Sequence, residues 1–313
     1  MRELFIEKKF RQDTLDIIDK CVEVLDEYAV DGYDLTLRQL YYQMVARDLF
    51  PDTWISEAGT KNNPENYNRL GTIVNDARLA GLMDWDMIVD RGRSTERNSH
   101  WKHPGEILDT VTRAFRIDKW ENQPFYIEVM CEKQALEGVL EPVCCVLDVP
   151  FTSNKGYASQ SFMYRKGKEI AKAAARGKHI HIFYLGDHDP SGLDMDRDIK
   201  ERLQLFAGEQ LNFHFKNLAV KRVALTLHQV DQHNPPPNPA KITDSRAKAY
   251  IDNYGDESWE LDALEPHILA DLVTAEVESL RDEALWEEAC REEEKMKQEL
   301  MVIAAKYKPK RKG

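Results

Sequence analysis

The chain contains 313 residues, of which 43 are basic and 55 acidic, so its formal net charge is −12. It has no stretch of about 20 apolar residues, the length that a membrane-spanning helix needs, and its N-terminus lacks the apolar block of a secretory signal. Its five cysteines have neither the spacing of a zinc site nor the density of a disulfide scaffold. These features exclude a membrane-spanning or disulfide-stabilised protein, and we expect a cytoplasmic location without a membrane partner.

The negative charge is concentrated in one segment. Residues 256–294 hold 15 acidic and 2 basic side chains, whereas residues 295–313 hold 7 basic and 1 acidic. A protein can bind a polyanion through a local basic face while it is acidic overall. The net charge therefore does not exclude DNA as a partner.

The first part of the chain, residues 1–118, has the pattern of short helices. Residues 11–29 carry apolar side chains at helical spacing, and TLRQLYYQMVARDLF, with Thr36 as N-cap, predicts a second helix. The segment that begins PENYNRLG predicts a third helix ending near Gly81, and the short extended stretch MIVD follows it. This order predicts a winged-helix DNA-binding domain of the catabolite-activator type.

From residue 119 onwards the pattern changes. The strand-like runs FYIEVM and HIHIFYL alternate with helical segments, and further strands are expected near VPFTS and KRVALT. Such alternation predicts an α/β fold with a parallel sheet, which we assign to residues 119–232. Residues 233–313 form a third region, in which the proline-rich QHNPPPNPAK is expected to lack regular structure and a long acidic helical segment with a basic tail follows.

Acidic side chains follow two of the predicted strands. Glu132 comes after the first strand, and Asp187 and Asp189 come after HIHIFYL. Two aspartates at i and i+2 point to the same side of an extended chain and repel each other unless a cation lies between them. Since parallel strands end at one edge of the sheet and Mg²⁺ prefers carboxylate oxygens, we predict a Mg²⁺ site. Helix capping is the alternative for the aspartates, and Glu128 and Glu137 compete with Glu132.

Basic side chains near these segments predict contacts to the phosphate backbone of DNA, which add affinity without sequence preference. They lie in and after the third predicted helix and beside the predicted metal site: Arg78, Arg91, Arg93, Lys133 and Lys155. His188, between the two aspartates, is expected to face the core. Glu260 and Asp262 are possible neighbours of the metal, but we interpret them as the start of an acidic helix.

Four short motifs, spread over residues 30–200, resemble one family. Its Toprim domain carries Val-Glu-Lys, Lys-Gly-Tyr-Pro and Asp-Gly-Asp-Pro-x-Gly, and its winged-helix domain carries Arg-x-x-Tyr-Tyr. This chain has Cys131-Glu132-Lys133, Lys155-Gly156-Tyr157, Asp187-His188-Asp189-Pro190-Ser191-Gly192 and, upstream, Arg38 with Tyr41-Tyr42. The chain thus resembles the A subunit of topoisomerase VI and its relative, the meiotic DNA double-strand-break protein, in a stand-alone bacterial or phage form.

The resemblance implies a DNA-cleaving transesterase. Tyr42 is implied to attack a DNA phosphodiester, Arg38 to stabilise the charge that develops, and the three carboxylates to hold Mg²⁺. The implied partners are double-stranded DNA, a second copy of the chain and a separate ATPase subunit, with a nucleoid-associated location. The resemblance also implies that the tyrosine of one copy meets the metal of the other, so that a dimer cuts both strands. The first alternative is a Toprim nuclease in which water attacks, and the second is a non-catalytic DNA-binding module with a Toprim scaffold. LYYQMV is also typical of a buried helix face, so Tyr41 or Tyr42 can serve packing alone.

Overall fold

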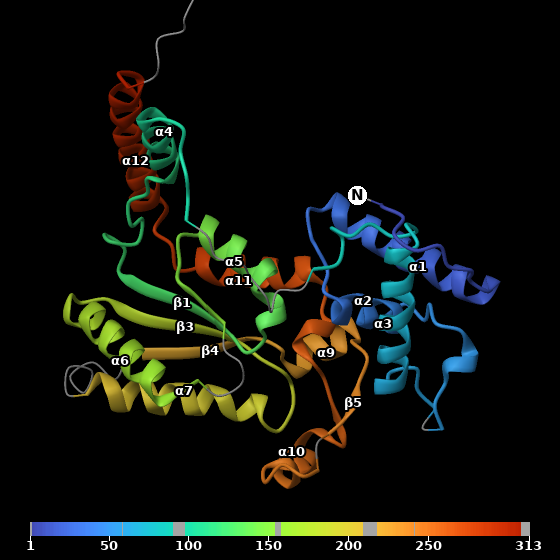
Figure 1. The fold of residues 1–313 in the computed structure, drawn as a ribbon. Coiled ribbons are helices and arrows are strands. Elements are labelled where there is room, and N and C mark those ends of the chain that lie inside the picture. Colours follow the sequence, from blue (N-terminus) through green and yellow to red (C-terminus); the bar gives the residue numbers. More distant parts are fainter. Residues whose placement is uncertain are drawn as a thin grey trace, which may run out of the picture.

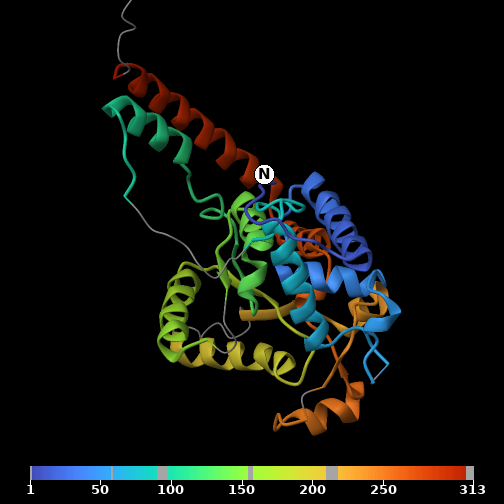
Figure 2. The same cartoon turned by 45° about the vertical axis from the view of Figure 1, so that its right-hand side comes forward.

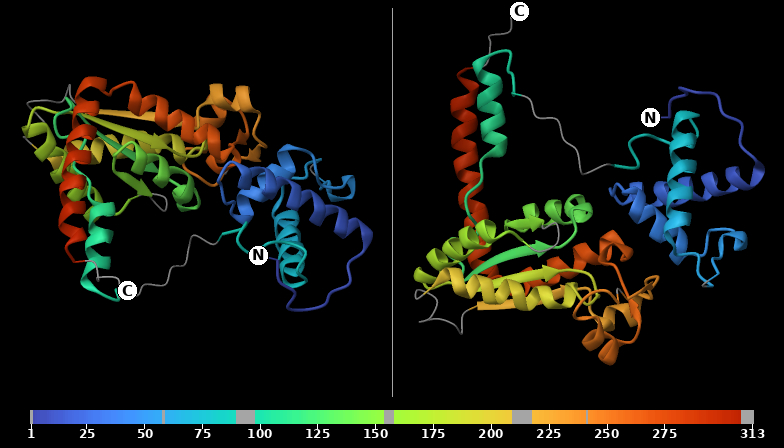
Figure 3. Two further views of the ribbon diagram at one scale, coloured as in Figure 1. Left: turned by 90° about the horizontal axis from the view of Figure 1, so that it is seen from above. Right: turned by 60° about the horizontal axis from the view of Figure 1, so that its bottom comes forward.

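Figure 1 shows the fold in a computed structural model of the chain, which describes residues 2–57, 59–89, 98–153, 158–208, 218–240 and 242–307. A parallel sheet with helices on both faces forms the centre, a group of N-terminal helices lies beside it, and two helices project from it (Figures 1 and 2). Figure 3 shows the same parts in two further orientations. The predicted α/β class is confirmed. No helix in the described ranges is long and apolar enough to cross a membrane.

The N-terminal helices are α1 (Gln12–Val30), α2 (Leu37–Ala46), the 3₁₀ turn η1 (Asp52–Trp54) and α3 (Pro64–Leu79). The patterns predicted the three α-helices, and Thr36 is confirmed as the N-cap of α2. Its hydroxyl accepts a hydrogen bond from Gln39 N (3.2 Å), and Gln39 Oε1 accepts one from Thr36 N (2.8 Å). This capping box fixes where α2 begins.

The segment MIVD, which follows α3, is the one that we expected to form a strand-like wing. Within the described residues it makes a single bridge between Leu35 and Ile88, in which Val89 N donates to Leu35 O at 3.0 Å. Residues 90–97 lie outside the described ranges. The wing therefore stays a prediction.

The central sheet contains β1 (Phe125–Cys131), β2 (Phe151–Ser153), β3 (His179–Leu185) and β4 (Leu218–Ala224). All four strands run parallel, in the order β2-β1-β3-β4. This agrees with the strands that the sequence predicted. Because the strands are parallel, their carboxyl ends lie at one edge of the sheet, where ligands of α/β folds gather.

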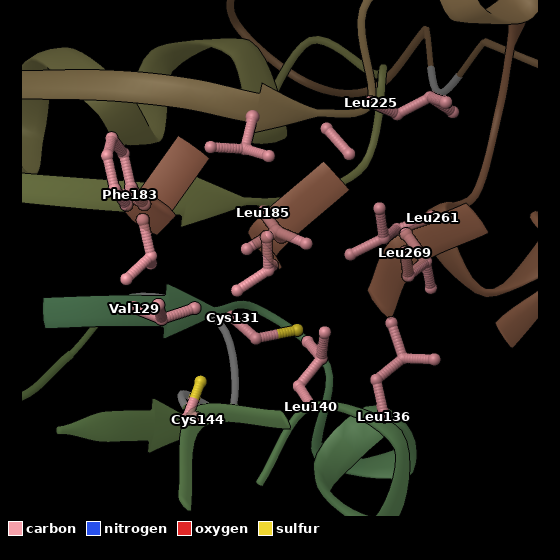
Figure 4. Packing of buried hydrophobic residues seen from close by; sticks show 14 of the residues in the cluster. Val129, Cys131, Leu136, Leu140, Cys144, Phe183, Leu185, Leu225, Leu261 and Leu269 are labelled. Atoms are coloured by element: carbon pink, nitrogen blue, oxygen red, sulfur yellow. The ribbon is translucent and has the colours of Figure 1, made fainter. Parts of the chain in front are cut away.

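Alternate residues of the strands face opposite layers of helices. Val129 and Phe183 pack with α5 and α11 on one face (Figure 4), whereas Met130 and Ile182 pack with α6 and α7 on the other. The bounds are η2 (Gln134–Leu136), a 3₁₀ turn, then α5 (Glu137–Val146), α6 (Gln160–Ala175), α7 (Gly192–Ala207) and α11 (Pro266–Glu278). Burial of both faces accounts for the nearly continuous apolar runs of β1 and β3.

The remaining elements of the C-terminal region are α9 (Leu227–His233), β5 (Asn238–Pro239), α10 (Ala247–Tyr254), β6 (Glu257–Ser258), the 3₁₀ turn η4 (Leu261–Ala263) and α12 (Glu283–Ala305). The expectation that QHNPPPNPAK lacks regular structure is wrong in part, because α9 ends within it and β5 pairs antiparallel with β6. The acidic segment is not one helix either. It begins as extended chain, and Asp282 starts α12 by accepting a hydrogen bond from Ala284 N (3.0 Å).

The projecting pair consists of α12 and α4 (Pro104–Ala114), which lie side by side (Figures 1 and 2). Glu293 ties α12 to the segment that follows α4. Its Oε2 accepts hydrogen bonds from Ile117 N (3.1 Å) and Lys119 Nζ (2.9 Å), and its Oε1 accepts one from Lys297 Nζ (2.5 Å). Burial opposes ionisation of this carboxyl, but the hydrogen bonds outweigh burial and lower the pKa of Glu293 to about 2.

We expect Glu293→Gln to lower the free energy of unfolding by about 2 kcal/mol at pH 7. Since folding lowers the pKa of Glu293, its contribution is present above the ordinary value of 4.5 and is lost as the pH falls towards 2. Urea unfolding at pH 7 and pH 3 measures this, and the difference between the proteins shrinks at pH 3. The control is Glu294→Gln, which removes the charge of an exposed carboxylate that accepts a hydrogen bond from Gln298 Nε2 (3.3 Å) and changes stability by less than about 0.5 kcal/mol. Equal effects of the two substitutions would contradict the role of Glu293.

Candidate functional site

A cavity of about 780 Å³ lies between α2 and the carboxyl edge of the sheet. Arg38 and Tyr42 of α2 line it from one side, and Asp187 and Asp189, in the turn after β3, line it from the other. Glu260, just before η4, completes this part of the wall. Residues that are far apart in the sequence, and that the motifs singled out separately, thus meet around one space.

The three predicted metal ligands lie close together at the ends of β1 and β3. Glu132 extends β1, since its backbone N donates to Leu185 O (2.9 Å), and its Oε2 accepts hydrogen bonds from Asp187 N (3.1 Å) and Tyr184 Oη (3.2 Å). Asp189 Oδ1 accepts from Gly192 N (2.6 Å) at the start of α7. This last bond is the helix-capping contact that we considered as an alternative to metal binding. Asp189 makes it while also lying near Glu132.

The electrostatics of these carboxylates favour a positive partner. Burial and the neighbouring Asp187 and Asp189 carboxylates raise the pKa of Glu132. Burial also raises the pKa of Asp187, although the Lys133 ammonium acts in the opposite direction. Like charges held together away from water disfavour their own ionised forms, so a cation bound here would stabilise them.

Lys133 supplies a positive charge to this site. Its Nζ lies 3.0 Å from Asp187 Oδ2, 2.9 Å from Glu260 Oε2 and 3.6 Å from Asp262 Oδ1. Arg38 Nη1 donates to the same Glu260 oxygen at 3.1 Å. We call Asp187, Glu260 and Asp262 the acidic cluster. Our interpretation of Glu260 and Asp262 as an ordinary helix start is wrong, because both face Lys133 and η4 is only a short turn.

Backbone contacts bring Glu260 and Asp262 to the turn after β3. His188 and Trp259 exchange two hydrogen bonds, of 2.9 and 3.0 Å, and Leu261 N donates to Asp187 Oδ1 at 2.8 Å. The sequence carried one signal for this arrangement, since Glu260 and Asp262 have the same i, i+2 spacing as the aspartate pair. That spacing alone does not indicate which segment they approach.

The two adjacent tyrosines of α2 have different surroundings. Tyr41 Oη accepts a hydrogen bond from Asn63 N (2.8 Å) and lies within bonding distance of Asn63 O (3.0 Å), so it holds the loop before α3. Tyr42 is 4% exposed, and the Asn238 and Glu260 side chains lie close enough to its phenol to affect its pKa. Burial, followed by the negative charge of the neighbouring carboxylates, raises the pKa of Tyr42. Both tyrosines line the cavity and pack in one core, but the Tyr41 hydroxyl is engaged by the loop before α3.

Two of the five residues that we predicted to contact DNA lie in the described ranges, and both make contacts within the chain. The Arg78 guanidinium lies 4.5 Å from the centre of the Trp85 ring and donates to Ile88 O at 3.2 Å, so it serves the fold. Lys133 is engaged in the acidic cluster. The remaining three lie outside the described residues, namely Arg91, Arg93 and Lys155. All five DNA contacts stay predictions.

The residues that competed for a site role have structural roles instead. Glu128 is fully buried and is bonded to Thr152 Oγ1 (2.7 Å) and Lys166 Nζ (3.0 Å), and Glu137 begins α5. His188 is buried, and its Nδ1 lies 2.9 Å from Tyr250 Oη. It therefore faces the core, as we expected.

The carboxylates at this edge fit a hard divalent cation in donor chemistry and in charge. Burial is the main cause of the raised pKa of Glu132 and of Asp187, and neither oxygen of the buried Asp262 accepts a hydrogen bond from the described residues. The oxygens of Glu132 and Asp187 are directed at N–H and ammonium donors. Across the described ranges no three His, Cys, Asp or Glu side chains are arranged to hold a metal. A bound ion thus requires these carboxylates to rearrange.

The chain matches no protein-family model, no curated protein and no solved structure. Any functional conclusion therefore depends on the cavity and its residues.

Proposed function

We propose that the protein is a DNA-cleaving transesterase similar to the A subunit of topoisomerase VI. In this proposal residues 1–118 act as a winged-helix domain and residues 119–232 as a Toprim domain. The observation that carries it is that Tyr42 lines the same cavity as Asp187 and Asp189 of its own chain, whereas the resemblance implies the metal site of a second copy. Transfer of a phosphoryl group to a protein hydroxyl requires the nucleophile and the acidic side chains to lie around the same cavity.

The proposed reaction exchanges one phosphoester for another. A bond forms between Tyr42 Oη and the DNA phosphorus, the bond from phosphorus to the sugar oxygen breaks, and the sugar oxygen leaves as a hydroxyl. The phenol must lose its proton, which passes to water, and the sugar oxygen takes up a proton from water as it leaves. Because burial raises the pKa of Tyr42, the attack needs nearby cations, and the Arg38 guanidinium supports the negative charge on the phenolate or the phosphate.

Mg²⁺ is the proposed cofactor, and Glu132, Asp187 and Asp189 would hold it. When bound, a divalent cation neutralises charge on the phosphate that undergoes transfer. Tyr184 and the backbone of Asp187 orient Glu132 through their hydrogen bonds to its Oε2. These contacts keep the carboxylate at the strand end.

Double-stranded DNA is the proposed partner. Its contacts are assigned to basic side chains of both domains, namely Arg78, Arg91, Arg93, Lys133 and Lys155. A second copy of the chain would allow both strands to be cut, and a separate ATPase subunit and nucleoid association follow from the same resemblance. One observation favours the nuclease alternative: Tyr42 is 4% exposed, so its hydroxyl must gain access to the phosphate, whereas water needs no such movement.

Incubation of the purified protein with supercoiled DNA and Mg²⁺, followed by detergent, tests the proposal. We expect linear DNA that enters a gel freely only after protease treatment, because the protein is linked to its ends. The double variant with Asp187→Asn and Asp189→Asn is expected to leave the plasmid uncut. Linear DNA free of protein before proteolysis would instead support the nuclease, and DNA binding without any cleavage would support the non-catalytic module.

A further inference from the structure

The ammonium of Lys133 lies at a point where carboxylate oxygens from two remote segments converge. The three distances from Nζ to oxygens of the acidic cluster are 2.9, 3.0 and 3.6 Å, and the Lys133 side chain is 17% exposed. Hard cations prefer carboxylate oxygens, although with Lys133 in place no three acidic side chains of the described residues are arranged to hold a metal. In the structure this point is occupied by a cation that the chain itself provides.

Asp262 indicates that one ammonium does not satisfy the cluster. Its side chain is fully buried, and neither of its oxygens accepts a hydrogen bond from a described residue. Its Oδ1 is directed at Lys133 Nζ but stays 3.6 Å away, beyond the length of a normal hydrogen bond. A buried carboxylate with so little compensation is costly, and a second positive charge at this point would stabilise it.

We propose that a divalent cation competes with the Lys133 ammonium for the acidic cluster and binds there by displacing it, sharing Asp187 with the Mg²⁺ site that Glu132 and Asp189 would complete. Oxygens coordinate Mg²⁺ at about 2.1 Å, so the cluster must contract around the ion once Nζ has left. The displaced ammonium remains next to the cavity, because Asp187 and Glu260 line that space. There it is available to a DNA phosphate, a role that rests on the proposed function, whereas the competition itself can be measured without DNA.

The first test measures Mn²⁺ binding by the electron paramagnetic resonance signal of the free ion. Lys133→Met removes the competing ammonium and is expected to tighten Mn²⁺ binding about tenfold or more. Lys166→Met is the matched control, since Lys166 pairs with the buried Glu128 at 3.0 Å and is 14% exposed. Its Mn²⁺ affinity is expected to stay within about twofold of wild type. Equal or weaker binding by Lys133→Met would overturn the proposal.

A second variant identifies the ligands. Asp262→Asn keeps the shape of the side chain but removes its charge, and we expect it to weaken Mn²⁺ binding about tenfold in the wild-type and Lys133→Met backgrounds. Unchanged affinity in both backgrounds would show that the ion does not bind to the acidic cluster. This outcome, too, would overturn the proposal.

A third test uses the wild-type protein and so does not depend on a variant that folds. A lysine released from its ion pairs reacts faster with an acetylating reagent, and peptide mass spectrometry reports each position. Mn²⁺ is expected to raise the acetylation rate of Lys133 several-fold and to leave that of Lys166 unchanged. No change at Lys133 at saturating Mn²⁺ would refute displacement. Loss of DNA cleavage with intact competition would refute only the proposed function, and cleavage without competition would refute only this inference.

Discussion

Replacement of Tyr42 by phenylalanine is expected to abolish the covalent protein–DNA product, with a rate at least about a thousandfold below that of wild type. The substitution removes one oxygen atom and keeps the ring, which is buried in the core formed by α1, α2 and α3. Stability should therefore change by no more than about 1 kcal/mol. The measurement is transfer of end-labelled DNA to the protein after detergent treatment, together with urea unfolding of the same preparation.

Tyr41→Phe is the matched control, because the two tyrosines are neighbours on α2. It removes the hydroxyl that accepts a hydrogen bond from Asn63 N (2.8 Å), so we expect a loss of about 1 kcal/mol in unfolding free energy and an unchanged yield of covalent product per folded molecule. A normal yield from Tyr42→Phe would exclude Tyr42 as the nucleophile. If that variant instead cuts DNA without a protein link, water is the attacking group.

The sheet and the acidic residues at its edge follow from sequence patterns with local causes. β1 and β3 are largely apolar runs buried on both faces, β1 ending just before Glu132 and β3 just before Gly186 and Asp187. Since parallel strands end at one edge, the proximity of Glu132 to Asp187 could be predicted without coordinates. The start of α2 could be predicted as well, because a Thr-x-x-Gln capping box involves only four consecutive residues.

Two features of the site could not be predicted in this way. Glu260 and Asp262 approach the turn after β3 only because the backbone of Trp259 pairs with that of His188, a tertiary contact that no local pattern encodes. The distinction between Tyr41 and Tyr42 has a different origin. Adjacent residues of a helix point about 100° apart, so the two tyrosines must have different neighbours. The sequence alone does not indicate which neighbours each tyrosine has.

Arg222, on β4, is a residue that sequence reasoning did not single out. Its Nη1 donates to Gly186 O (3.1 Å) and Asp187 O (3.2 Å), its Nη2 donates to Gly192 O, and the same nitrogen pairs with Asp196 Oδ1 at 2.8 Å. One guanidinium thereby ties the turn that carries both aspartates to the beginning of α7. The planar fork of arginine can bridge several acceptors at once, and we infer that Arg222 holds the turn in shape.

We expect Arg222→Met to lower the free energy of unfolding by about 3 to 5 kcal/mol, since it leaves Asp196 without its counter-charge and removes a donor from three carbonyls, of which Gly186 O keeps Leu225 N (2.8 Å). Urea unfolding gives this value directly. Arg222→Lys keeps the charge but not the fork, so it should recover only part of the loss.

Arg197→Met is the control on the neighbouring surface of α7. Arg197 pairs with Asp194 (2.8 Å) and Glu201 (2.6 Å), and more than half of its side chain is exposed. Exposed pairs of this kind contribute little, so we expect a change below about 1 kcal/mol. If both arginine variants lose the same small amount, the turn is held by its own backbone hydrogen bonds. A large loss confined to Arg222→Met means instead that the Arg222 guanidinium on β4 stabilises the turn that carries the aspartates.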